Sequence, residues 1–298
     1  MDVIRDFQLP LFGGLDASQI VNVASVPQRS PFRYPGGKTW LVPFVRQWLI
    51  SMPKRPAEFI EPFAGGAIVG LSVAFEQLAG HVTLVELDEQ VAAVWKTIIH
   101  GDYEWLANRI INFDLTHEHV DHILAQTQVS LEEMAFQTIL RNRINRGGIL
   151  APGAGKIKYG ENGKGIKSRW YPDTLRKRIV GIGKIRDRIT FIQGDGMQAL
   201  EQNADRFDVA CFIDPPYTAD GKKAGRRLYT HFEIDHERLF TIAEALKGDF
   251  LMTYDNASGV KQMADRHGLV TELVAMKNTH HAEMKELLIG RDLKWLQG

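Results

Sequence analysis

The chain has 298 residues, of which 44% are hydrophobic and 24% charged, and its 36 Lys and Arg balance its 36 Asp and Glu. This composition argues against a disordered or fibrous chain and predicts one large globular domain with a small inserted or appended unit. No run reaches the ~20 apolar residues of a membrane helix, and the single cysteine, Cys211, excludes an intramolecular disulfide and a Cys-cluster zinc site. The first residues lack a secretory signal, so we expect a cytoplasmic protein without membrane contact.

Short apolar runs alternate with stretches of helical spacing along most of the chain, after an irregular arm at residues 1–29. The alternation is typical of βαβ units on a parallel sheet. It predicts an α/β domain from residues 30–100 and 186–298, with a mostly parallel sheet of about seven strands. The segments expected to form strands are AEFIEPF, HVTLVEL, RITFIQG, FDVACFIDPP, GDFLMTYDN and LVTELVAM.

Residues 101–185 interrupt this pattern and are expected to form an inserted small helical unit. The insertion begins with helical runs and then becomes rich in Gly and basic residues. The segment from Arg141 to Arg188 contains fourteen Lys or Arg but only three acidic residues, which is the charge distribution expected where phosphates bind. The histidines of HEHVDH lie among polar residues and favour a solvated helix over a metal site, so we expect no metal.

Two signals for a nucleoside site follow one another in the first half of the chain. Gly65 and Gly66 lie between a strand and a helix, where glycines let the backbone approach a ligand. About twenty residues on, Glu86 ends the next strand, where an acid can accept both hydroxyls of a ribose. Tight turn geometry and helix capping by Glu86 or Asp88 are the structural alternatives.

The tetrapeptide Asp214-Pro215-Pro216-Tyr217 is the most specific motif, because it places a carboxylate at the tip of a buried strand. Two prolines fix the chain in an extended turn without backbone N–H donors. Asp214 and the carbonyl of Pro215 can therefore both accept from an amino group, while Tyr217 can stack on a planar base. A simple strand stop is the alternative interpretation.

Together these motifs resemble the Dam-like family of DNA adenine-N6 methyltransferases, from Phe32 to about Leu296. The resemblance implies a Rossmann-like methyltransferase dependent on S-adenosylmethionine (SAM), in which residues 101–185 form the DNA target-recognition domain. Arg33 to Lys38 resembles the cofactor motif whose lysine approaches the methionine carboxylate of SAM. The implied cofactor-binding residues are Tyr34, Gly37, Lys38, Pro62, Phe63, Ala64, Gly65, Gly66, Glu86, Asp195, Gly196 and Asp214.

The resemblance implies methyl transfer from SAM to the N6 amino group of a flipped-out adenine at a specific site in double-stranded DNA. The catalytic residues would be Asp214, Pro215, Pro216 and Tyr217. The expected DNA contacts are Arg143, Lys164, Lys167, Arg169, Lys222, Lys223, Arg226 and Arg227. A cognate restriction endonuclease is a second candidate partner. The alternatives are adenine methylation in RNA, cytosine-N4 methylation in DNA and a catalytically dead DNA-binding protein.

Overall fold

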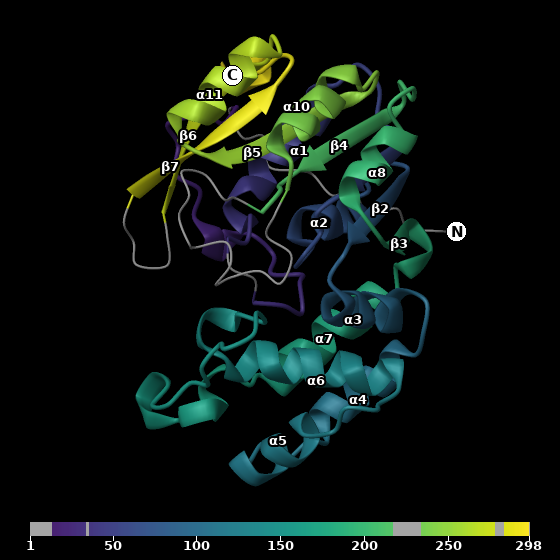
Figure 1. Ribbon diagram of the computed structural model, residues 1–298, viewed down its shortest axis with the longest axis vertical. Helices are drawn as coiled ribbons and strands as arrows, with labels where there is room; N and C mark the ends of the chain where they lie inside the picture. The colour runs from purple at the N-terminus through teal and green to yellow at the C-terminus, as the bar shows by residue number, and fades with distance from the viewer. Residues whose placement is uncertain (1–13, 34–35, 217–233, 278–282, 298) are drawn as a thin grey trace, which may run out of the picture.

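The computed structural model describes residues 14–33, 36–216, 234–277 and 283–297. A seven-stranded sheet runs through the molecule in the order β3-β2-β1-β4-β5-β7-β6 (Figure 1). Neighbouring strands from β3 to β5 are parallel, and β7 is antiparallel to both β5 and β6. The strands are β1 Glu58–Glu61, β2 His81–Glu86, β3 Ile189–Gln193, β4 Val209–Ile213, β5 Asp249–Asp255, β6 Val270–Lys277 and β7 Glu283–Gly290. The parallel order 3-2-1-4-5 is that of the Rossmann fold, so the expected fold class is confirmed.

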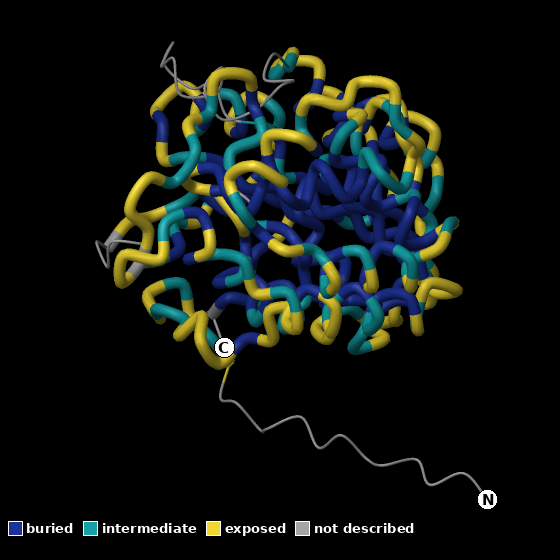
Figure 2. The backbone as a smooth tube through the Cα atoms, turned by 90° about the horizontal axis from the view of Figure 1, so that it is seen from below, coloured by how far each residue is buried: buried dark blue, intermediate teal, exposed yellow. Residues whose placement is uncertain are grey.

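Helices cover both faces of the sheet and bury alternate residues of its strands. In β4, Ala210 and Phe212 belong to one hydrophobic core, while Cys211 and Ile213 belong to the other. The period of two in the strand side chains produces this division. The first core is covered by α1 (Val42–Ser51), α2 (Ile68–Glu76) and α3 (Glu89–Ile99), and the second by α8 (Gly196–Gln202), α10 (His236–Ala245) and α11 (Ser258–Arg266). Figure 2 shows the buried backbone gathered in the middle of the molecule.

The helices of the expected insertion lie together at the end of the molecule next to α3 (Figure 1). They are α4 (Tyr103–Ile111), α5 (His117–Leu124), α6 (Leu131–Ile144) and α7 (Pro172–Gly183). Leu106, Ile139 and Ile179 from these helices share one continuous core with Trp95 of α3. The insertion therefore has no separate core among the described residues, and its boundaries at residues 101 and 185 stay a prediction.

Short 3-10 helices connect the larger elements. They are η1 (Val23–Ser25), η2 (Thr39–Leu41), η3 (Arg146–Gly148), η4 (Glu161–Gly163), η5 (Gly165–Arg169), η6 (Arg186–Arg188) and η8 (Lys294–Gln297). Within the described residues, no helix has the length and apolar character needed to cross a membrane.

Candidate active site

One cavity of about 1220 Å³ opens at the carboxyl ends of the parallel strands. It lies where β1 is flanked by β2 on one side and β4 on the other, which is where the strand order of this sheet reverses. Open α/β sheets bind ligands in this crevice. The glycine turn, Glu86, Asp195, Lys38 and Asp214 all line the cavity, so the residues expected from separate motifs meet at one site.

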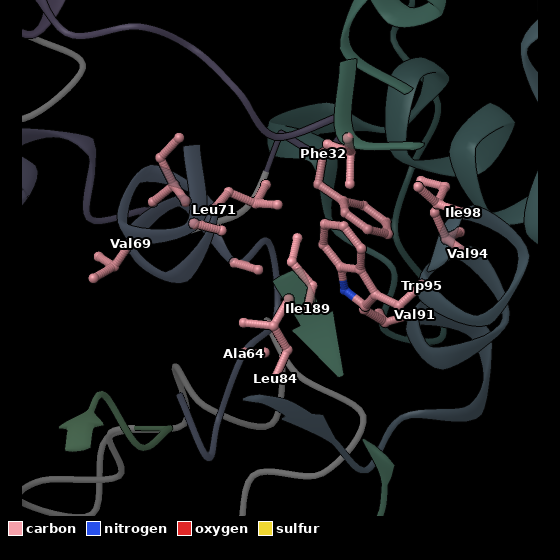
Figure 3. Packing of buried hydrophobic residues seen from close by; sticks show 14 of the residues in the cluster. Phe32, Ala64, Val69, Leu71, Leu84, Val91, Val94, Trp95, Ile98 and Ile189 are labelled. Atoms are coloured by element: carbon pink, nitrogen blue, oxygen red, sulfur yellow. The ribbon is translucent and has the colours of Figure 1, made fainter. Parts of the chain in front are cut away.

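The glycine turn between β1 and α2 is held in place from both sides. Gly65 has φ +46°, a left-handed conformation that favours glycine. Its N–H donates to Glu86 Oε2 at 2.8 Å, and its carbonyl accepts from Trp95 Nε1 at 2.9 Å. Trp95 itself packs against Phe32 with ring centroids 5.6 Å apart (Figure 3). The turn is thus a rigid backbone surface on the cavity wall.

Glu86 ends β2 beside this turn, and both of its carboxyl oxygens already accept one backbone hydrogen bond. The second bond comes from the N–H of Asp88 to Oε1, at 2.9 Å. Burial is the largest cause that raises the pKa of Glu86 to about 7. Asp88 caps α3 by accepting from the N–H groups of Gln90 and Val91, so the capping alternative holds for Asp88.

Asp195 and Gly196 close the cavity from the start of α8. Asp195 caps this helix by accepting from the Met197 N–H at 2.8 Å, and its side chain is exposed. Gly196 presses against the residue that precedes the glycine turn, because a Cβ on Gly196 would lie 2.1 Å from the carbonyl oxygen of Pro62. No other residue type fits there without displacing that segment.

The turn after β4 carries Asp214, with Pro215 and Pro216 following it at the cavity wall. Asp214 Oδ1 accepts from Thr253 Oγ1 at 2.7 Å and lies 3.1 Å from Lys38 Nζ. Tyr217 lies outside the described residues, as does Tyr34. The expected grouping of Asp214 with the expected cofactor residues is thus present, but Lys38 contacts the Asp214 carboxylate itself.

Two further acids line the cavity that the sequence did not single out as site residues. Lys38 is only 4% exposed and lies 3.4 Å from Glu286 Oε2 on β7. Glu61, at the end of β1, accepts from the Gly70 N–H at 2.7 Å. Burial raises the pKa of Glu61 well above its usual value, with repulsion from Asp214 adding to the effect. Burial also raises the pKa of Glu286, which Lys38 partly offsets.

Arginines line another part of the same cavity. Arg143 of α6, an expected DNA contact, is only 3% exposed. It donates to the carbonyl of Pro31, and its Nε is buried with no hydrogen-bond partner in the described part of the chain. Arg178 of α7 donates to the carbonyl of Ser30 at 2.9 Å. Burial, then the charges of Arg178 and Arg33, lower the pKa of Arg143 to about 9.

The side chain of Asn142 fixes the backbone of Arg33. Its Oδ1 accepts from the Arg33 N–H at 2.8 Å, and its Nδ2 donates to the Arg33 carbonyl at 2.9 Å. Gly148 packs so closely that a Cβ there would lie 2.2 Å from the same carbonyl oxygen. Arg33, Arg143, Arg169 and Arg178 all line the cavity, and we call these four residues the arginine wall.

The remaining expected contacts fall on the surface or outside the described residues. Lys164 and Lys167 are exposed near η5. Lys222, Lys223, Arg226 and Arg227 lie outside the described residues. The histidines of α5 are exposed, as expected for a solvated helix, and the described residues contain no cluster of His, Cys, Asp and Glu that could hold a metal ion.

Several solved structures are similar to the chain, all at low TM-score. A putative RNA methyltransferase from Pyrococcus horikoshii is 11% identical at a TM-score of 0.38, covering 93% of this chain and 91% of that one. An rRNA methyltransferase from Streptomyces viridochromogenes is 11% identical at a TM-score of 0.37, covering 85% and 84%. A precorrin-6y C5,15-methyltransferase from Geobacter metallireducens is 10% identical at a TM-score of 0.34, covering 93% and 94%. TM-scores this low carry no argument about fold or substrate.

The sequence itself gives a more specific match. No protein of curated function matches the chain. Residues 34–137 match the family model described as D12 class N6 adenine-specific DNA methyltransferase. This range contains Lys38, the glycine turn and Glu86, but not Asp195, Gly196 or Asp214. The match confirms the resemblance that the motifs indicate, and over residues 34–137 the chain carries the sequence pattern of this methyltransferase family.

Proposed function

We propose that this chain transfers a methyl group from SAM to the N6 amino group of a flipped-out adenine in DNA. The observation that carries the proposal is the position of Asp214. Its carboxylate follows a buried strand, precedes two prolines, and lines the same cavity as the glycine turn and Glu86. A methyl donor and an amino group could therefore meet in one enclosed space.

The residues present fit SAM as the methyl donor. Glu86 keeps acceptor capacity for ribose hydroxyls, since an ionised carboxylate offers about four lone-pair sites and backbone N–H groups do not occupy them all. Asp195 is exposed at the cavity and can accept from an adenine amino group. Asp214 and Glu286 place two carboxylates beside one lysine, and Glu61 lines the same cavity, which favours a cationic ligand. Bound SAM supplies a methyl group on a positively charged sulfur.

Asp214 and the carbonyl of Pro215 would act on the target amino group. An amino group conjugated to a purine is a poor nucleophile, because its lone pair is delocalised into the ring. Two acceptors on its N–H groups favour a pyramidal nitrogen with the lone pair directed away from them. Asp214 would also hold the proton that leaves as the N–C bond forms. Positioning and electrostatic stabilisation then supply the rate, with no covalent intermediate on the enzyme.

The arginine wall supports a phosphate-bearing substrate. Within the described residues, neither Arg143 nor Arg178 forms a salt bridge with a carboxylate, and both donate to backbone carbonyls. Buried guanidinium groups close to one another repel, and an anion between them relieves this repulsion. Guanidinium groups bind phosphate in a bidentate manner. The exposed lysines near η5 extend the positive surface outward.

The decisive experiment is transfer of labelled methyl from SAM to DNA from a methylation-free host, followed by digestion to nucleosides. We expect label in N6-methyldeoxyadenosine. Label in N4-methylcytosine would overturn the choice of base, and label only in RNA added in parallel would overturn the choice of nucleic acid. SAM binding without transfer to any of these would identify a catalytically dead binding protein.

A pair of variants separates chemistry from binding in that assay. Asp214→Ala should lower methyl transfer by a few powers of ten and leave DNA affinity nearly intact, because the lost acceptor is charged and partly desolvated. Asp205→Ala is the control, since Asp205 is fully exposed and pairs with Lys247 away from the cavity. Near wild-type transfer by the Asp214 variant would remove Asp214 from the mechanism.

A further inference from the structure

Thr253 carries a buried hydroxyl in strand β5. Its side chain is fully buried in the middle of β5, between Met252 and Tyr254. Burying a hydroxyl costs free energy unless it forms a hydrogen bond. Here the hydroxyl donates to Asp214 Oδ1 at 2.7 Å, so its burial is compensated by the carboxylate of the turn after β4.

The sheet brings the two residues together. Ile213 of β4 is paired in register with Met252 of β5, so Asp214 follows at the level of Thr253. Met252 packs in the second core and Leu251 in the first, which places Thr253 on the same face as Leu251. Lys38 reaches Asp214 from η2, next to α1 on that first-core face.

Thr253 and Lys38 constrain Asp214 differently. The ammonium of Lys38 lies between two carboxylates, 3.1 Å from Asp214 Oδ1 and 3.4 Å from Glu286 Oε2, at the end of a long side chain. The hydroxyl of Thr253 is bonded directly to the branched β-carbon of the residue. The strand that carries it is hydrogen-bonded on both sides. Such a side chain has little rotamer freedom. The direction of the Asp214 carboxylate therefore depends on Thr253 more than on Lys38.

We propose that Thr253 is a positioning residue for methyl transfer, whose hydroxyl fixes Asp214 Oδ1 and so directs the carboxylate at the target amino group. This inference rests on the proposed function. Thr253 itself does not line the cavity. Its loss is therefore expected to lower the rate of the chemical step and to leave the binding of SAM and nucleic acid unchanged.

Two substitutions test whether methyl transfer requires the hydrogen bond of the Thr253 hydroxyl or only the packing of the side chain. Thr253→Val keeps the shape and removes the donor, and we expect single-turnover methyl transfer to fall about 10- to 100-fold, the loss typical for a hydrogen bond to a charged group. Thr253→Ser keeps the donor and should retain most of the rate. Dissociation constants for SAM and for a duplex oligonucleotide should stay within about twofold of wild type in both variants.

Thr83→Val is the matched control. Thr83 is also a buried strand threonine that donates to a carboxylate, that of Glu58, but it does not line the cavity and Glu58 does not either. This variant should transfer methyl groups at the wild-type rate. Thermal unfolding of all three variants shows whether each is folded. If Thr253→Val is not folded, the methyl-transfer rate of Thr253→Ser decides the question.

The outcomes separate this inference from the proposed function. Wild-type rates in Thr253→Val, or equal losses in the Val and Ser variants, would overturn the positioning role while methylation by the wild type stands. A parallel loss of SAM affinity would overturn it as well, because Thr253 would then act through binding. Absence of methyl transfer by the wild type would instead overturn the proposed function.

Discussion

Protonation of Glu86 should control SAM affinity around neutral pH. The pKa of Glu86 is raised to about 7, chiefly by burial. Both carboxyl oxygens already accept a backbone N–H, from Gly65 and from Asp88. A protonated carboxyl group loses acceptor capacity, so only the ionised form can also hold both ribose hydroxyls. Affinity is thus fully present above the pKa and is lost as the pH falls through it.

The size of the effect follows from that pKa. If only ionised Glu86 binds, the dissociation constant is multiplied by about 11 at pH 6 and about 1.1 at pH 8, so SAM should bind about tenfold more weakly at pH 6. Calorimetric titrations at pH 6, 7 and 8 measure this directly. In Glu86→Gln the amide cannot ionise, and one backbone N–H loses its acceptor, so affinity at pH 8 should fall by ~1–3 kcal/mol.

The ratio of wild type to Glu86→Gln isolates the residue, because ionisation of SAM itself is common to both titrations. Glu89→Gln is a suitable control, since Glu89 is exposed in the first turn of α3. The same pH dependence in wild type and Glu86→Gln would refute the reasoning, and unchanged affinity in the variant would remove Glu86 from the site.

Three further changes probe other parts of the site. Replacing the exposed Lys164 and Lys167 with Ala should flatten the salt dependence of DNA binding by about 0.9 in log–log slope for each phosphate group that is no longer neutralised, and should leave SAM affinity intact. An unaltered slope would exclude these lysines from the interface. Gly196→Ala should weaken SAM binding at least tenfold, because the added Cβ would displace the segment before the glycine turn. Gly194→Ala should not weaken it, since its Cβ would lie at an ordinary van der Waals distance of 3.7 Å from its nearest neighbour. Equal SAM affinities of the two variants would contradict this reasoning. Tyr217→Ala should lower methyl transfer by a stacking contribution of ~1–3 kcal/mol and Tyr217→Phe should not, as single-turnover rates would show.

Local patterns were sufficient to predict the framework of the sheet. Each of the six expected segments contains a strand. Apolar runs and the turn residues that bound them are patterns among neighbouring residues, so they can be recognised without knowing which distant segments come into contact. The position of β7 between β5 and β6 could not be predicted in the same way. It depends on pairing between distant segments, and it is this pairing that brings Glu286 next to Lys38.

The sequence of helix α7 contains a helical pattern that was not recognised. Leu175, Ile179 and Ile182 recur at the spacing of a buried helical face, and Pro172 occupies the first turn, where proline is favoured. This segment was not singled out as a helix from the sequence, where the charge of its basic residues drew more attention than its apolar spacing. Arg178, on this helix, thereby joins the arginine wall although nothing in its own neighbourhood distinguishes it from Arg176, which is exposed.

Acidic and basic residues lie at different places in the cavity, so two ligands of opposite charge would be directed to different positions there. Asp214 and Glu286 flank a single lysine and Glu61 lines the same cavity, while the arginine wall comes from the insertion and from Arg33. A cationic methyl donor is favoured among the carboxylates and a phosphate among the arginines, and each is disfavoured at the other position. The equal totals of acidic and basic residues in the whole chain do not reveal this separation. If the substrate is a nucleic acid, as proposed, this sorting would keep its phosphates away from Asp214, and the uncharged amino group of a base would be the part best suited to approach the carboxylate.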